Sequence, residues 1–221
     1  MSNDRTINWE ELPHENFLGH GIEGLVLRLD DKKCIKIYSP DKENSAEREF
    51  FNYYRLRKKG FLVPKPFELV NIYIGGKSVK LPKRDEFMGI GLYTHCDVNC
   101  VPAVIKEYFP GTPYGKKKPT INELKGLVNY LNNLHRNNLT FSDGIALDFI
   151  SSDKRTALVD CSTLMDKEEC EDKYSCDFIY ISQRYQERIL SDLENELTYN
   201  RCKPMSFKLK LIMAELLSNF K

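Results

Sequence analysis

The residues of this chain with the clearest chemical potential are three glycines and the lysine that follows them. Gly19, Gly21 and Gly24 have the spacing G-x-G-x-x-G, and Lys36 lies in the second of two apolar runs that come next. Glycine has no Cβ, so a backbone of this kind can approach phosphate oxygens closely. Val26 would present an apolar surface to a flat base, and the Lys36 ammonium would contact the phosphates. The segment therefore predicts a nucleotide-binding loop.

Two other phosphate-binding loops are also rich in glycine, and both fit this segment poorly. A dinucleotide-binding loop needs a helix that begins at the glycines and an acidic residue about 20 positions further on. Here the glycines lead into an apolar run, a polar turn at residues 30–33 and a second apolar run, which predicts strand, turn and strand. A P-loop needs Gly-Lys-Ser/Thr, which is missing. A glycine-rich hairpin without a ligand remains the structural alternative.

The elements that must position these residues begin with a helix over residues 44–56. Asn44 or Ser45 is a suitable N-cap for it, and its aromatic and leucine side chains recur at roughly helical spacing. Gly60 is expected to end this helix. Extended segments are then predicted around residues 69–74 and 103–108.

Acidic residues occur at three further points that could bind a metal or move a proton. A capping box at Thr120 and Glu123 predicts the start of an amphipathic helix, and Asp143 and Asp148 follow that helix on a loop. Asp160 then ends an apolar strand. Mg²⁺ prefers one or two carboxylates together with phosphate oxygens. Each acid alone is usually a solvated turn residue, but their order after a glycine loop and a lysine favours a shared site.

The order of these features resembles the catalytic core of the protein-kinase-like superfamily over about residues 15–165. The resemblance implies that Asp143 orients the acceptor hydroxyl and takes its proton, with Lys36 as the other catalytic residue. It also implies that Asp148 and Asp160 bind the metal, which would be Mg²⁺ or Mn²⁺, and that the nucleotide is ATP.

The same resemblance implies a set of nucleotide-binding positions. A helix carboxylate would hold the strand lysine, with Glu49 as the first choice and Glu47 as the alternative; either could equally be a solvated helix charge. Backbone groups at Glu107 and Phe109 would bind the adenine edge, although this segment could also be a buried edge strand. The full expected set is Gly19, His20, Gly21, Ile22, Glu23, Gly24, Val26, Lys36, Glu49, Glu107 and Phe109.

At three points the sequence departs from the family pattern, which limits the residue roles that the resemblance implies. Ser142 replaces the arginine that often precedes the catalytic aspartate, which suggests activity without an activation-loop switch. Cys161 and Ser162 replace the Phe-Gly that usually follows the metal aspartate. Asp148 replaces an asparagine, which adds a negative charge. None of the three removes a group that phosphoryl transfer needs.

The expected fold is α+β and bilobal, as in protein kinases, within one domain over residues 1–221. A small antiparallel sheet with one helix would form an N-lobe at about residues 12–107, and a reduced, mainly helical C-lobe would cover residues 108–221. Two C-terminal helices are predicted, near residues 177–197 and 206–220. Irregular structure is expected in the first dozen residues and in residues 77–100 and 166–174.

Composition narrows the expected partners and location. The 221 residues carry a formal net charge of +1, which gives no strong field for nucleic acid or anionic lipid. No apolar run approaches the length of a membrane helix, and no signal peptide is evident. The seven cysteines are scattered without a paired C-x-x-C, which favours a reducing compartment over disulfides or zinc. We therefore expect a monomer that is cytoplasmic, or that is secreted into a host cell.

The function expected from the resemblance is a minimal bacterial protein kinase of the effector type, which transfers the γ-phosphate of ATP to a Ser, Thr or Tyr hydroxyl of a protein. For a secreted effector that protein would belong to the host. A small-molecule kinase acting on an antibiotic, a sugar or lipopolysaccharide is the first alternative, since the chain also shares features with aminoglycoside and sugar phosphotransferases. A catalytically silent nucleotide-binding module is the second alternative.

Overall fold

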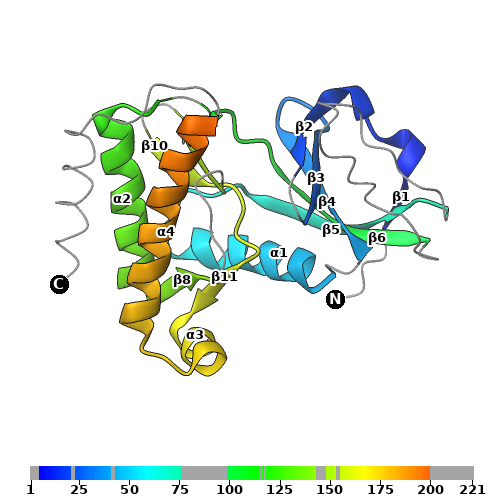
Figure 1. Ribbon diagram of the computed structural model, residues 1–221. Coiled ribbons are helices and arrows are strands. Elements are labelled where there is room, and N and C mark those ends of the chain that lie inside the picture. The colour runs from blue at the N-terminus through cyan, green and yellow to red at the C-terminus, as the bar shows by residue number, and fades with distance from the viewer. Residues whose placement is uncertain are drawn as a thin grey trace. The chain divides into compact units, whose positions relative to one another are not determined.

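The computed structural model describes residues 5–20, 23–40, 43–75, 99–114, 116, 118–142, 148–152 and 155–199. These residues form an α+β structure (Figure 1). The chain divides into two compact units, which are described separately below. Unit 1 comprises Met1–Lys59 and Pro64–Phe109, and unit 2 comprises Gly60–Val63 and Pro110–Lys221.

Unit 1 is built on a six-stranded sheet with the strand order β1-β5-β6-β4-β3-β2. β1 runs parallel to β5, and the other neighbouring strands are antiparallel. The expectation that the first dozen residues are irregular was wrong, because β1 adds a strand at one edge of the sheet. The strands are β1 (Thr6–Asn8), β2 (Phe17–His20), β3 (Gly24–Arg28), β4 (Lys33–Tyr38), β5 (Pro66–Tyr73) and β6 (Cys100–Glu107).

The period-two alternation of the central strands separates two faces of this sheet. Alternate residues of β3 to β6 form an apolar core on one face, which includes Leu27, Ile35 and Ile105. The opposite face packs against α1 (Glu43–Lys58), and Tyr38 and Val104 are buried there. Residues paired directly across antiparallel strands share a face, so the alternation assigns each strand residue either to the core or to the helix.

Helix α1 begins at Glu43, before both of the residues predicted as its N-cap. Asn44 and Ser45 both lie inside the helix, so the prediction that one of them is the N-cap was wrong. An N-cap residue has a non-helical backbone, and these two residues do not. The end of the helix was predicted correctly: Gly60 follows it with a φ of 83°, a left-handed conformation that glycine adopts without strain.

Unit 2 contains two packed helices, α2 (Ile121–Arg136) and α4 (Phe178–Tyr199) (Figure 1). The predicted capping box of α2 is confirmed, since Thr120 and Glu123 exchange hydrogen bonds between side chain and backbone. His135 of α2 stacks on Phe178 of α4, with ring centroids 5.4 Å apart, and hydrogen-bonds Ser182 of α4 at 2.9 Å. The apolar stripe of α2 is buried as expected and comprises Leu124, Leu127, Val128, Tyr130, Leu131 and Leu134.

Short strands and one further helix complete unit 2. Two pairs of strands in this unit are antiparallel: β8 (Leu139–Phe141) with β11 (Leu164–Asp166), and β9 (Phe149–Ser152) with β10 (Arg155–Leu158). β7 (Thr112–Pro113) adds to the outer side of β9. The expectation of irregular structure at residues 166–174 was wrong, because α3 (Lys167–Tyr174) forms there on a capping box between Asp166 and Glu169. The helix predicted near residues 206–220 lies outside the described residues.

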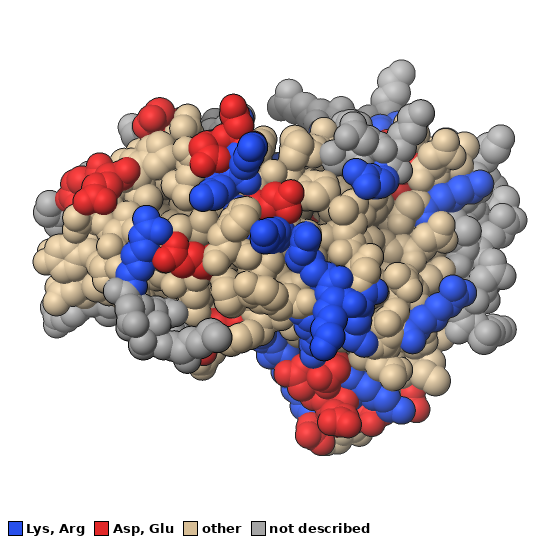
Figure 2. All heavy atoms as spheres, turned by 180° about the vertical axis from the view of Figure 1, so that it is seen from behind, with Lys and Arg blue, Asp and Glu red and all other residues tan. Residues whose placement is uncertain are grey.

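Both signs of charge are distributed over the surface. On the face drawn in Figure 2, Lys and Arg side chains are interspersed with Asp and Glu side chains. This agrees with the formal net charge of +1. None of the helices in the described part of the chain has the length and apolar character needed to cross a membrane.

Candidate active site

The central feature of unit 1 is a buried ion pair between Lys36 of β4 and Glu49 of α1. Lys36 lies opposite Val26 on one side and Val104 on the other, so its side chain belongs to the helix-covered face of the sheet. Its Nζ atom lies 2.8 Å from Oε2 of Glu49, and the two residues are 4% and 0% exposed. Glu47, the alternative partner from the sequence, is exposed on the outside of α1.

The Glu49 carboxylate accepts hydrogen bonds from three further groups. Oε1 accepts from Nζ of Lys106 at 2.6 Å and from the Tyr53 hydroxyl at 2.6 Å, while Oε2 also accepts from the Tyr38 hydroxyl. Burial alone would raise the pKa of Glu49, but the ammonium groups of Lys106 and Lys36 and their hydrogen bonds hold that pKa well below its ordinary value. Glu49 is therefore a fixed anion that anchors both lysines.

Lys106 was missed by the sequence analysis. It lies on β6, is 4% exposed, and also bonds the Tyr53 hydroxyl at 2.7 Å. A signal was present in the sequence, because Lys106 directly follows the uncharged, largely apolar run 101–105. A lysine within such a strand is rarely buried without a partner. That partner could not be read from the sequence, because Lys106 and Glu49 are 57 residues apart.

The glycine loop lies at the turn from β2 to β3. A Cβ on Gly24 would lie 1.9 Å from the carbonyl oxygen of Ile37, so the close approach of β3 and β4 requires glycine there. A Cβ on Gly19 would meet nothing within 4 Å, so packing does not require glycine at that position. Gly21 and Ile22, two of the expected nucleotide-binding positions, lie outside the described residues, and for His20 the structure describes only the backbone in β2.

Glu23 of this loop contacts the lysine directly. Its Oε2 atom lies 3.2 Å from Nζ of Lys36, and its side chain is 22% exposed. Its backbone carbonyl accepts a hydrogen bond from the Ser39 amide at 2.8 Å, which ties the start of β3 to the residue after β4. The Lys36 ammonium therefore contacts one carboxylate inside the unit and a second, more exposed one on the loop.

The two residues expected at the adenine edge lie at the end of β6 and just beyond it. The Glu107 amide donates to the carbonyl oxygen of Lys65 at 2.8 Å, and the Glu107 carboxylate accepts from the Lys65 amide at 2.9 Å. The Glu107 amide is thus used within unit 1. Phe109 is half-buried and ends the unit.

In unit 2 the backbone brings two of the expected acids together. The Val159 amide donates to the carbonyl oxygen of Asp148 at 2.7 Å. Asp160 follows Val159 directly, so the backbones of the two acids lie on adjacent segments. Oδ1 of Asp160 accepts from the amide and hydroxyl of Ser162, at 3.3 and 3.0 Å. Asp143 lies outside the described residues. Among the residues that are described, no group of three His, Cys, Asp or Glu side chains is placed to hold a metal ion.

Each unit has its own set of candidate binding groups. Unit 1 holds a buried, charged lysine next to a glycine loop, which suits the binding of phosphate oxygens. Unit 2 holds two half-buried carboxylates on adjacent segments, and such a donor set fits Mg²⁺, which usually takes one or two carboxylates and fills its other positions with water and phosphate.

Comparisons with known proteins give no family for this chain. No family profile matches it, and no curated protein matches it. Among solved structures, it is similar to the bifunctional kinase-methyltransferase WbdD, with 11% sequence identity and a TM-score of 0.47. That match covers 96% of this chain and 44% of the WbdD chain, so this chain spans less than half the length of that protein. Similarity at this level assigns neither family nor activity.

Proposed function

We propose that this protein is an ATP-dependent phosphotransferase with a kinase-like fold, which moves the γ-phosphate of ATP to a hydroxyl group. The observation that carries the proposal is the buried pair of Lys36 and Glu49, which joins a strand that follows a glycine loop to the helix packed on that strand. A carboxylate fixed in this way keeps the lysine charged and in one place. Phosphoryl transfer depends mainly on such positioning and on charge stabilisation.

The contact between Lys36 and Glu23 supports a ligand on the loop side of the lysine. The Glu23 carboxylate already supplies an oxyanion to the ammonium group, at 3.2 Å. A phosphate oxygen of ATP can take the place of that carboxylate, since Glu23 is partly exposed and lies on the loop.

The acids of unit 2 take the remaining roles in this proposal. Asp148 and Asp160 would hold Mg²⁺, which would neutralise charge on the phosphates. Asp143 would orient the acceptor hydroxyl and accept its proton. Phosphoryl transfer asks no further covalent help from the protein.

The acceptor can be of two classes. The sequence favours a Ser, Thr or Tyr hydroxyl of a protein, with the chain acting in the cytoplasm or, as an effector, on a host protein. A pocket between α3 and α4 in unit 2 favours a small molecule as the second candidate. The oligomeric state that we propose is a monomer.

Thermal unfolding with and without MgATP tests the nucleotide part of the proposal. We expect MgATP to raise the melting temperature of the wild-type chain, because a ligand that binds only the folded state stabilises it. Lys36→Met should remove most of this rise, and Asp160→Ala should remove the part that depends on Mg²⁺. Lys32→Met, at an exposed position on the turn before β4, is the matched control and should respond like wild type. No rise in the wild-type chain would contradict the proposal.

A further inference from the structure

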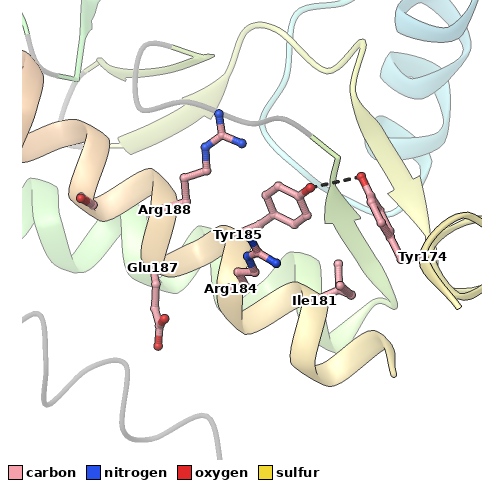
Figure 3. Close-up of a pocket in the computed structure, with 7 residues that line it drawn as sticks. Tyr174, Ile181, Arg184, Tyr185, Glu187 and Arg188 are labelled. Atoms are coloured by element: carbon pink, nitrogen blue, oxygen red, sulfur yellow. Dashed lines mark hydrogen bonds between the residues drawn. The ribbon is translucent and has the colours of Figure 1, made fainter. Parts of the chain in front are cut away.

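A pocket of about 520 Å³ lies in unit 2 between the end of α3 and the middle of α4, and none of the residues assigned above lines it (Figure 3). Tyr174 of α3 forms one wall. Arg184, Tyr185 and Arg188 of α4 form another. Small-molecule sites in proteins typically have volumes of roughly 300–1,000 Å³, so this pocket has a suitable size for one.

The pocket wall is connected to the strand that leads to the proposed catalytic aspartate. The Tyr174 hydroxyl shares a hydrogen bond of 3.1 Å with the Tyr185 hydroxyl and lies 3.5 Å from the carbonyl oxygen of Ser142. Ser142 directly precedes Asp143 in the sequence, and both α3 and α4 contact β8, which ends at Phe141. A molecule in this pocket would therefore lie beside the backbone that enters the catalytic loop.

The charge of the pocket indicates what it binds. Arg184 and Arg188 are four residues apart, so they share one face of α4. Both are exposed, and in Figure 3 they flank the Tyr185 side chain. Glu187 also lines the pocket, so the two guanidinium groups exceed its acidic side chains by one charge. Guanidinium groups stay protonated at any physiological pH and bind phosphate and carboxylate through paired hydrogen bonds. The two tyrosine rings add apolar surface for the body of a ligand.

We propose that this pocket holds the acceptor through an anionic group, and that the acceptor is a small hydroxyl compound carrying a phosphate or a carboxylate. This inference rests on the proposed phosphotransferase function. In the reaction, the acceptor oxygen forms a bond to the γ-phosphorus of ATP, and the bond from that phosphorus to the bridging oxygen of ADP breaks. The hydroxyl proton passes to Asp143. An acidic segment of a protein offers similar chemistry, but the size of the pocket favours a small molecule.

Binding of inorganic phosphate to the full chain tests the site without any nucleotide. We expect saturable binding that Arg184→Gln weakens by about tenfold, the usual effect of losing one charge-assisted hydrogen bond. Arg136→Gln changes an exposed arginine at the end of α2 and should leave the affinity unchanged. Equal affinities for Arg184→Gln and Arg136→Gln would overturn the proposal.

The acceptor class is tested with labelled ATP, Mg²⁺ and a cell extract divided beforehand into proteins, small molecules retained by an anion exchanger, and small molecules that pass through it. We expect acceptor activity in the retained fraction, with a KM raised about tenfold and a kcat little changed in Arg184→Gln. Activity confined to the flow-through or to the proteins would overturn the proposal. Transfer to no fraction, with phosphate binding still dependent on Arg184, would contradict the phosphotransferase function and leave the anion site standing.

Discussion

At the scale of single residues, Glu49 joins two equally buried lysines that differ in their other contacts. Lys36 contacts the loop residue Glu23 as well as Glu49, whereas Lys106 is bonded to Glu49 and to the Tyr53 hydroxyl. Removing one partner of a buried ion pair is costly because the remaining charge loses its compensation. Replacing one of the two lysines leaves the other beside Glu49, so the roles of the two lysines can be tested separately.

Lys36→Met and Lys106→Met should therefore behave differently. We expect Lys36→Met to weaken MgATP binding by at least about tenfold, since it removes the phosphate contact that we propose for this lysine. Lys106→Met should lower the free energy of unfolding by about 3 kcal/mol and change MgATP affinity much less, since Lys106 positions Glu49. Nucleotide titration together with urea unfolding measures both effects. Equal losses of nucleotide affinity in the two variants would contradict these roles.

The pH dependence of stability provides a second test at this scale. The folded state holds the pKa of Glu49 below its ordinary value of about 4.5, so the unfolded chain binds a proton first as the pH falls. The stabilisation by Glu49 is complete above that value and is lost progressively below it. Its contribution to the slope is at most about 1.4 kcal/mol per pH unit.

Glu49→Gln lacks this titration. Urea unfolding at pH values from 7 to 3 should show that the variant is less stable than wild type at neutral pH and that the difference narrows below about pH 4.5. The exposed neighbour Glu47→Gln is the matched control and should follow the wild-type curve. A difference between Glu49→Gln and wild type that stays constant down to pH 3 would contradict the assignment.

At the scale of elements, the two ends of the glycine pattern have different reasons to be glycine. Gly24→Ala would drive a Cβ into the Ile37 carbonyl of β4, so we expect a loss of stability of about 2 kcal/mol or more. Gly19→Ala meets open space, so stability should change by less than about 0.5 kcal/mol. If the loop closes on phosphates, Gly19→Ala should still weaken MgATP binding. Unchanged MgATP binding in Gly19→Ala would favour a simple hairpin turn, and unchanged stability in Gly24→Ala would contradict the close approach of β3 and β4.

Elements with a strong local signal could be predicted from the sequence, and elements without one could not. The capping box and apolar stripe of α2 fixed that helix within a residue at its start. Helix α3 has Cys170 as its buried residue and therefore lacks an apolar stripe. Its capping box at Asp166 and Glu169 is the signal in the sequence that could have predicted it. Strand β1 has three residues and pairs with β5, far along the chain, so no local pattern marks it.

Part of the candidate site could be predicted from the sequence in the same way. Lys36 and Glu49 could be named together because the order of strand and helix matched a family pattern, and the structure brings them into contact. The choice between Glu49 and Glu47 depends on which face of α1 meets the sheet, a packing property that was not certain from the sequence. The contact of Lys106 with Glu49 joins positions 57 residues apart, and the pocket of unit 2 depends on how α3 packs against α4, so no local sequence pattern marks either of them.

At the scale of the whole molecule, the proposed chemistry is divided between the two units. The lysine and the glycine loop belong to unit 1, and the carboxylates and the anion pocket belong to unit 2. A nucleotide-binding module without activity would need only the first set. In the proposed reaction, turnover requires the acids of unit 2 as well. A variant of unit 2 that keeps nucleotide binding and loses transfer would therefore distinguish an enzyme from a silent module.

The most direct test of the central claim is transfer of label from γ-labelled ATP, with Mg²⁺, to acceptors in a whole-cell extract, for wild type, Lys36→Met and Asp143→Asn. We predict transfer by wild type, loss of transfer and of ATP binding in Lys36→Met, and at least a 100-fold loss of transfer with ATP binding retained in Asp143→Asn, about what loss of a general base costs. Transfer by Asp143→Asn at the wild-type rate, or no transfer by wild type, would contradict the account.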